Sequence, residues 1–287
     1  MTGDGVNDAP ALSRANIGIS MGIAGTDVAK DASDMVLQDD NFANIVNAVE
    51  EGRKIYTNIR NFVRYQVSTN VAAVALLLLA NVFFQWPLPL TPTQILVINI
   101  LMDGPPAVAL GVERMHANVM DRPPRPVDES LPNMQDLVLI FYLGAVMVIG
   151  TLIVYFIALE NGTEEYARTM CFSVFIFFQL FNVMNCRSNE DSVFKLGLFS
   201  NRAIYLAIMF SVGLLLLVVQ GAEWAIPLTS FQIGELLSTT PLQKEDWIIV
   251  ILVASTVFMI EEFRKLLRSA GIFSVRTNKR TQTLIQK

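Results

Sequence analysis

Residues 66–84 have the sequence QVSTNVAAVALLLLANVFF, a stretch that is almost wholly apolar and contains no charged side chain. A helix needs about 20 predominantly apolar residues to cross the hydrocarbon core of a membrane, so this stretch predicts a membrane-spanning helix. No proline occurs between residues 41 and 86, and a single helix of that extent would be about 66 Å long. That length is roughly twice the ~30 Å hydrocarbon core. The sequence therefore predicts a stalk joined to a first membrane helix over 41–86.

Further apolar runs follow in the region 87–265. Each approaches the length of a membrane span, and we place five of them at about 93–112, 137–159, 168–186, 203–221 and 247–263. The whole chain of 287 residues is 53% hydrophobic and 16% charged, whereas soluble domains carry about 25% charged residues. The predicted fold class is mainly α, a six-helix transmembrane bundle.

The distribution of basic residues predicts the orientation of the bundle. From residue 53 onward, every Lys and Arg except Arg168 and Lys244 falls in a segment predicted to be cytosolic. Such an asymmetry is typical of membrane proteins, whose cytosolic loops are enriched in Lys and Arg. We therefore expect a multi-pass integral membrane protein with both termini in the cytosol and with residues 266–287 as a basic cytosolic tail.

Residues 1–40 have a different pattern, typical of the end of an α/β domain. Helices are predicted at 8–15 and 26–33, with Thr26 as an N-cap, and buried strands at 17–21 and 35–37. This alternation predicts parallel strands. The segment is too short to bury a core of its own, so we expect it to be completed by strands upstream of it.

The opening residues, TGDGVNDAPAL at positions 2–12, place two carboxylates around a predicted strand-to-helix turn. Gly3 and Gly5 allow a tight bend and a close approach of the backbone to a ligand. Asp4 and Asp8 offer the oxygen ligands that Mg²⁺ prefers, and Asn7 can hydrogen-bond a phosphoryl oxygen or a neighbouring carboxylate. The alternative is an ordinary surface turn, because Gly, Asn and Asp are common turn residues.

A second candidate site lies within the predicted span 93–112. Asn99 and Asp103 are four residues apart, on one face of an α-helix. A carboxylate at membrane depth costs about 2.5–3.5 kcal/mol on insertion scales, so it usually faces a partner or an ion. The alternative is a structural kink in which a neighbouring helix satisfies Asp103.

The prolines that follow Asp103 predict a disturbed backbone at the same depth. Pro105 and Pro106 cannot donate hydrogen bonds, which frees the carbonyls of Leu101 and Met102. Irregular backbone is tolerated in a membrane where it lines a cavity. The combination predicts an oxygen-rich pocket suited to a hard cation such as Ca²⁺ or Mn²⁺.

Two other polar groups occur in the predicted spans. Ser68, Thr69 and Asn70 form a patch in the first, and Gln179, Asn182 and Asn185 repeat every three residues in the fourth. The patch is equally compatible with cation ligation and with hydrogen bonding between helices. The stripe favours helix packing, because polar side chains commonly hydrogen-bond across membrane helices.

The run at 2–12 closely resembles the hinge motif of P-type ATPases, within the haloacid dehalogenase superfamily. The resemblance implies that Asp4 binds the catalytic Mg²⁺ beside Gly3 and Gly5, and that Asn7 and Asp8 arrange the phosphoryl group and its loop. It also implies a haloacid-dehalogenase-like phosphorylation domain, of which 1–40 would be the C-terminal part. The aspartate that is phosphorylated in this family, and the domains that bind ATP, would belong to a missing N-terminal part.

The segment INILMDGPPA at 98–107 is similar to a membrane helix of calcium pumps, most of all to their secretory-pathway calcium/manganese branch. The resemblance makes Asn99 and Asp103 ligands of the transported cation, with Asn70 as a further candidate. Three positions depart from the two-ion pumps of the family, because Ala73, Met102 and Gln179 replace ligand residues there. We therefore expect one Ca²⁺ per cycle, and these departures weaken Asn70 as a direct ligand.

Together these observations predict the C-terminal part of an ATP-driven Ca²⁺ pump of the plasma membrane, working through an aspartyl phosphate and inactive as this fragment alone. The expected partners are the lipid bilayer, a divalent cation and the missing N-terminal part. The alternatives are a non-catalytic cation-binding or regulatory membrane subunit, a Mn²⁺ or monovalent-cation pump, and a phosphatase fused to an anchor. Two cysteines and one histidine argue against a disulfide scaffold or a zinc site, and no segment resembles a nucleic-acid module.

Overall fold

The fold is taken from a computed structural model that describes residues 1–114, 119–121, 123–126, 129–224 and 232–270. These residues form two compact units. The first comprises 1–56 with the described part of 115–124, and the second comprises 57–114 with the described part of 125–287. Most of the predicted basic tail, residues 271–287, lies outside the described residues.

The first unit contains a small parallel sheet, as the alternating pattern predicted. Its strands β1 (Thr2–Gly3), β2 (Ile19–Met21) and β3 (Met35–Leu37) lie in that order. The helices α1 (Ala9–Arg14) and α2 (Asp27–Asp31) connect them. The Thr26 hydroxyl accepts a hydrogen bond from Ala29 N at 3.3 Å, which confirms the predicted N-cap.

Asp40 holds the loop that follows β2. Its carboxylate accepts hydrogen bonds from the backbone nitrogens of Gly22 (2.6 Å), Ile23 (3.0 Å) and Ala24 (2.8 Å). These donors, that of Ile23 foremost, lower the pKa of Asp40 below its ordinary value of 3.8. Asp40 adopts a positive φ of 55°, a conformation that Asp and Asn tolerate better than most residues.

The chain then forms a long helix, α3 (Ala43–Leu77), which continues as the π-helical stretch η2 (Leu78–Phe83). Its residues belong to both units. The next predicted span is broken into three pieces: α4 (Pro92–Val97), the π-helical η3 (Ile98–Met102) and α5 (Gly104–Gly111). π-Helical turns are rare and often occur at functional sites.

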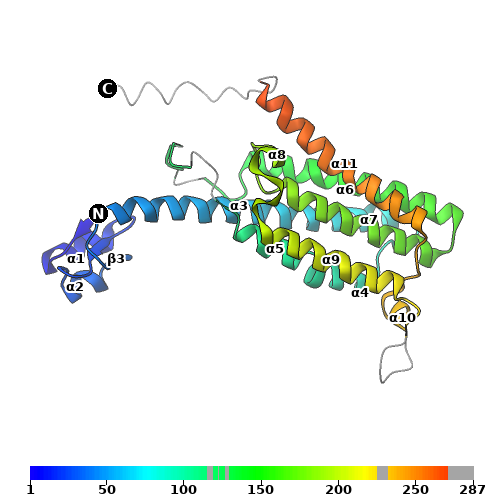
Figure 1. The fold of residues 1–287 in the computed structure, drawn as a ribbon, viewed down its shortest axis with the longest axis horizontal. Helices are drawn as coiled ribbons and strands as arrows, with labels where there is room; N and C mark the ends of the chain where they lie inside the picture. Colours follow the sequence, from blue (N-terminus) through cyan, green and yellow to red (C-terminus); the bar gives the residue numbers. More distant parts are fainter. Residues whose placement is uncertain (115–118, 122, 127–128, 225–231, 271–287) are drawn as a thin grey trace. The chain divides into compact units, whose positions relative to one another are not determined.

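The rest of the second unit is a bundle of helices (Figure 1). The longer ones are α6 (Met134–Asn161), α7 (Glu164–Asn185), α9 (Arg202–Gln220) and α11 (Lys244–Ser269). Short elements connect them: α8 (Val193–Leu196), the 3₁₀ turn η4 (Leu198–Ser200) and α10 (Ile233–Leu237).

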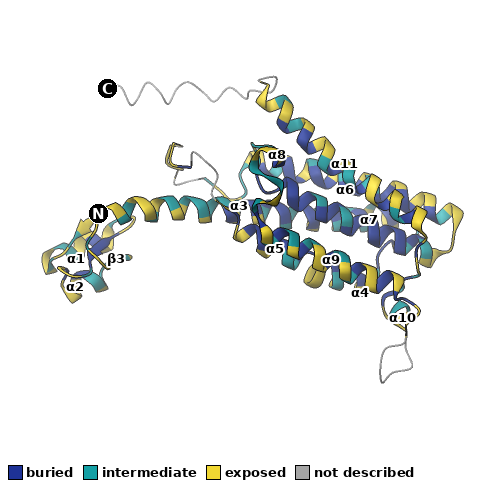
Figure 2. Ribbon diagram, viewed as in Figure 1, coloured by how far each residue is buried: buried dark blue, intermediate teal, exposed yellow. Residues whose placement is uncertain are grey.

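Helix α7 is the centre of this bundle. In its apolar stretch 83% of the residues are buried, against 28–44% in the other four membrane-length helices. Figure 2 shows α7 as the most continuously buried helix, while α6 and α9 expose one side. Since α7 packs against α6, α9 and α11, its neighbours shield it on several sides.

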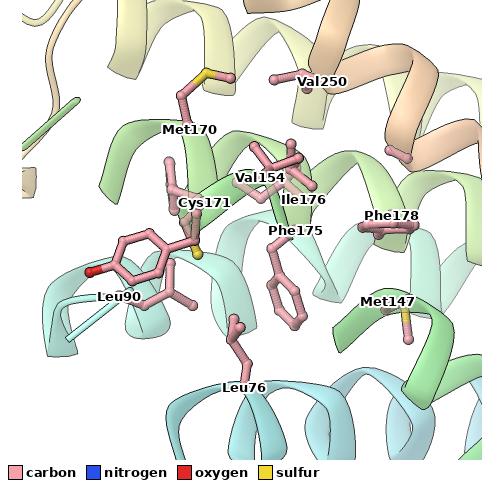
Figure 3. Close-up of a cluster of buried hydrophobic side chains, with 14 of the residues drawn as sticks. Leu76, Leu90, Met147, Val154, Met170, Cys171, Phe175, Ile176, Phe178 and Val250 are labelled. Carbon is pink, nitrogen blue, oxygen red and sulfur yellow. The ribbon is translucent and has the colours of Figure 1, made fainter. Parts of the chain in front are cut away.

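The core around α7 is apolar (Figure 3). It contains the following buried side chains: Leu76, Leu90, Met147, Val154, Met170, Cys171, Phe175, Ile176, Phe178 and Val250. Gly150 of α6 lets Phe178 approach closely, because a Cβ at Gly150 would lie 2.5 Å from the ring of Phe178. Small residues at membrane-helix interfaces allow such close packing, which replaces the hydrophobic driving force that operates in water.

The membrane helices partly match the expectation of six spans. Five helices in the described part of the chain are long and apolar enough to cross a membrane: Ala43–Phe83, Pro92–Gly111, Met134–Asn161, Glu164–Asn185 and Arg202–Gln220. The sixth predicted span falls on α11, where charged residues flank the apolar run 247–260 on both sides. That run is shorter than the ~20 residues of a typical span, so a crossing by α11 stays a prediction.

The role of Asp40 is testable through amide exchange of its loop. Because the pKa of Asp40 is lowered in the folded state, its stabilising effect is present above the ordinary value and is lost as pH falls through the folded value. We expect the protection factors of Gly22, Ile23 and Ala24, corrected for intrinsic rates, to fall below about pH 3.8. In Asp40→Asn they should be lower at pH 7 and independent of pH in this range. Identical pH profiles in both proteins would contradict this role.

Candidate functional site

The opening motif forms a turn organised by Asp8. The Asp8 carboxylate accepts hydrogen bonds from the backbone nitrogens of Asp4 (3.1 Å) and Gly5 (2.9 Å). A Cβ on Gly3 would lie 2.5 Å from Cβ of Asp8, so the turn leaves no room for a side chain there. Thr26 N donates to Asp4 O at 2.8 Å, which ties the turn to the start of α2.

This arrangement gives the two carboxylates different surroundings. Asp8 is half-buried and bound to backbone, whereas Asp4 is exposed at the carboxyl end of β1. Asn7 is also exposed. An exposed carboxylate at this position fits a Mg²⁺ ion that also binds phosphate oxygens. Asp4 is thus the carboxylate of the motif best placed to hold such an ion.

Asp103 is the centre of the candidate cation site. It follows η3 directly and its side chain is buried, with no exposed surface. One carboxylate oxygen accepts hydrogen bonds from Gln66 Nε2 (3.0 Å) and Thr69 Oγ1 (3.1 Å) of α3. Its other oxygen has no partner within the described chain that meets hydrogen-bond geometry, although the buried Tyr65 hydroxyl interacts with the carboxylate. Leaving such an atom unpaired is costly, and the open oxygen is suited to bind a cation.

Asn99 and Asn70 differ from Asp103 in burial, since both are exposed. The expected shared face of Asn99 and Asp103 is therefore not observed. The rule that residues four apart lie together holds for α-helices, whereas here Asp103 N donates to Ile98 O (2.8 Å), five residues back. The assignment of Asn99 and Asn70 as cation ligands stays a prediction.

The disturbed backbone has a partner in α9. Ser211 Oγ donates to Met102 O at 3.2 Å, and this carbonyl has no α-helical donor because Pro106 lies four residues on. Met102 O thus lacks its α-helical hydrogen bond, as the prolines predicted, but Ser211 occupies it. The hydrogen bond fixes the broken helix to α9 beside Asp103.

The polar patch and the polar stripe contribute to helix packing. Asn182 Nδ2 donates to Ser68 Oγ (3.0 Å), and Asn185 Nδ2 donates to Val257 O (3.1 Å). These bonds join α7 to α3 and α11, as the packing interpretation of the stripe predicted. Gln179 is buried, and its carbonyl oxygen lacks a hydrogen-bond partner among the described residues.

Two residues of the site were not predicted from the sequence. Gln66 binds Asp103 directly. Tyr65 is fully buried and interacts electrostatically with Asp103, although its hydroxyl does not meet hydrogen-bond geometry. Both lie three or four residues before Thr69, on one face of α3, and that spacing is the signal that could have revealed them.

The contact between Thr69 and Asp103 is testable by a double-mutant cycle. The Thr69 hydroxyl has one hydrogen, which either Asp103 or Gln66 O can accept. We expect Thr69→Val and Asp103→Asn to be coupled by about 0.5–2 kcal/mol in the free energy of unfolding, measured in mixed micelles.

Thr151→Val is the matched control. Thr151 is equally buried in a membrane helix, and its hydroxyl donates to Met147 O. Its coupling to Asp103→Asn should be within about 0.3–0.5 kcal/mol of zero, the additivity seen for independent sites. Equal coupling in the two cycles would show that Thr69 has no specific interaction with Asp103.

Comparisons with known proteins agree with this geometry. Residues 87–267 match the family described as cation transporting ATPase, C-terminus. The chain is 45% identical to Calcium-transporting ATPase 1 of Schizosaccharomyces pombe, over 97% of the chain and 30% of that relative. It is 42% identical to the rat Calcium-transporting ATPase type 2C member 2, over 93% of the chain and 27% of that relative. The human type 2C member 1 is 47% identical over 76% of the chain and 24% of its own length.

The chain therefore spans less than a third of the length of these relatives. Its membrane-length helices and the family match together describe a multi-pass membrane protein. The match covers well over half of the chain, from the end of the first membrane helix almost to the end of α11. The chain belongs to the cation-transporting ATPase family, of which it represents the C-terminal region.

Proposed function

We propose that this chain forms the ion-transporting part of an ATP-driven Ca²⁺ pump, together with a piece of its phosphorylation site. The observation that carries the proposal is Asp103, a buried carboxylate with one open oxygen in a broken membrane helix. The relatives are named as calcium-transporting ATPases, which supports Ca²⁺ as the cation. Asn99 and Asn70 are proposed as further oxygen ligands, since Ca²⁺ takes 6–8 of them.

The energy source is proposed to be ATP, through an aspartyl phosphate formed outside this chain. Mg²⁺ at Asp4 would neutralise charge on the phosphoryl group during its transfer. Asp8 would keep the turn in shape through its backbone hydrogen bonds, and Asn7 would contact a phosphoryl oxygen. Helix α3, which is unbroken from Ala43 to Leu77 and carries Gln66 and Thr69, would transmit the change to Asp103.

We further propose that one Ca²⁺ moves per ATP, in the plasma membrane, with both termini cytosolic. The ion count rests on three positions without a carboxylate or hydroxyl, namely Ala73, Met102 and Gln179. Met102 and Gln179 are buried in the bundle. The orientation rests on the placement of Lys and Arg.

The role of Asp103 can be tested after co-expression of the chain with the part of the Schizosaccharomyces pombe relative that it does not match. We expect Ca²⁺-stimulated ATP hydrolysis in the complex, and its loss in Asp103→Asn, because the amide cannot neutralise a divalent ion. Asp246→Asn is the control, since Asp246 is a buried carboxylate bound to Tyr166 Oη (2.7 Å) at the start of α11.

If Ca²⁺-stimulated ATP hydrolysis is unchanged in Asp103→Asn, the assignment of Asp103 as the cation ligand is wrong. ATP-independent Ca²⁺ flux through liposomes containing the chain alone, with no stimulated hydrolysis in the complex, would favour a passive subunit instead.

The ion count is a separate prediction. Uptake of ⁴⁵Ca²⁺ into sealed vesicles, measured against phosphate release, should give about one Ca²⁺ per ATP, because the open carboxylate of Asp103 supports a single site of hard oxygen ligands. A ratio near two would refute the one-ion proposal while leaving Asp103 as a ligand. Replacing Ca²⁺ by Mn²⁺ in the same vesicles compares the two cations directly.

A further inference from the structure

A buried ion pair lies at the C-terminal end of α5, whereas Asp103 precedes the N-terminal end of this helix. Glu113 and Arg187 are 1% and 0% exposed. Arg187 binds both carboxylate oxygens of Glu113, through Nε and Nη2, each at 2.9 Å. Glu113 lies two residues after α5, and Arg187 lies two residues after α7. The pair therefore joins the ends of two helices that are 74 residues apart in sequence.

The remaining polar atoms of this pair also have partners. Arg187 Nη1 donates to the carbonyls of Gly197 and Leu198, both at 3.2 Å, and Nη2 also contacts Ser200 Oγ. Asn201, the N-cap of α9, donates to Glu113 Oε2 at 2.9 Å. A buried pair with such complete hydrogen bonding has one favoured geometry, and removing one partner leaves an unpaired buried charge.

Several contacts also fix the C-terminal carbonyls of α5. The last carbonyls of a helix have no partner within it. Asn201 Nδ2 donates to Ala109 O at 3.0 Å, and Asn58 Nδ2 of α3 donates to Gly111 O and Glu113 O, both at 3.1 Å. The end of α5 is thus held by three other helices, α3, α7 and α9.

Helix α5 connects this anchored end to Asp103. It has eight residues, about 12 Å, and it begins at Gly104, immediately after Asp103. The segment before Asp103 is π-helical, so regular α-helical hydrogen bonds do not fix the carboxylate from that side. The anchored end of α5 therefore adds a constraint on where Asp103 lies, beside the direct contacts of Gln66 and Thr69 and the bond of Ser211 to Met102 O.

We infer that Glu113 and Arg187 are positioning residues for cation binding at Asp103, which they do not touch. The ion pair fixes the C-terminal end of α5, and the short helix transmits this constraint to the carboxylate. This inference rests on the proposed function, because it assumes that Asp103 binds the cation.

The test uses the complex described above and a matched control. Arg187→Met leaves Glu113 unpaired, Glu113→Gln removes the charge of the carboxylate, and Arg187→Lys keeps the positive charge. Lys265→Met is the control, since Lys265 and Glu262 form a similarly buried ion pair (3.2 Å) on α11. Lys265 also donates to Asn185 O at the end of α7 (3.1 Å), so this variant perturbs the α7 end without removing a contact to α5.

Residues that act on a binding site without contacting it typically change the affinity by about 2- to 30-fold. We expect Arg187→Met and Glu113→Gln to raise the Ca²⁺ concentration for half-maximal ATP hydrolysis by about 2- to 30-fold, with little change in the maximal rate. Arg187→Lys should partly restore the affinity, and Lys265→Met should keep it. Unchanged affinity in Arg187→Met and Glu113→Gln, or an equal loss in Lys265→Met, would overturn the inference.

Hydrogen exchange of the purified chain in nanodiscs distinguishes failure of this inference from failure of the proposed function. Amides between Met102 and Ala109 should exchange faster in Arg187→Met and at the original rate in Lys265→Met. A complex that never responds to Ca²⁺ would refute the pump proposal, and exchange alone would then decide whether the ion pair fixes α5. Unchanged exchange in Arg187→Met would overturn that constraint.

Discussion

The structure of the second unit depends on how it accommodates one carboxylate, Asp103, at membrane depth. Thr69 and Gln66 of α3 satisfy one oxygen of Asp103, and the other stays open within the described chain. A charge in this position is costly, so neighbouring elements must be arranged to support it. The π-helical turn before Asp103, the prolines after it and the contact of Ser211 with Met102 O all lie within a few residues of this carboxylate.

The carbonyl groups at the ends of the helices also need hydrogen-bond partners, because they have none within their own helix. Carbonyls at the ends of α5 and α7 accept hydrogen bonds from side chains of other helices, among them Asn58, Asn61 and Lys265. Most of these bonds are buried within the protein, so each donor replaces a solvent molecule. The same bonds connect α3, the helix shared by both units, to the elements that surround Asp103.

Local pattern predicted much of this fold. Apolar length indicated the membrane helices, the strand–helix alternation predicted the parallel sheet, and Thr26 was a recognisable cap. Pro105, Pro106 and Asp103 predicted a broken helix, because the residues that cause the break are close together in the sequence. The pairing of Glu113 with Arg187 could not be predicted in this way, because it depends on how distant helices meet. The same is true of Ser211 and Met102 O, and the exposure of Asn99 depends on a π-turn that no residue spacing indicates.

The enclosure of α7 separates the interior of the bundle from its lipid surroundings. Hydrophobic mismatch between a protein and a thicker or thinner bilayer acts first on side chains that touch acyl chains. In this chain those belong to helices with exposed apolar faces, such as α6 and α9, whereas α7 contributes few. Changes in sterol content or acyl-chain length would therefore tilt the outer helices first. Helix α3, whose apolar stretch is only 28% buried, would respond with the outer helices. The hydrogen bond from Asn182 to Ser68 would then carry such a change from α3 to the enclosed α7.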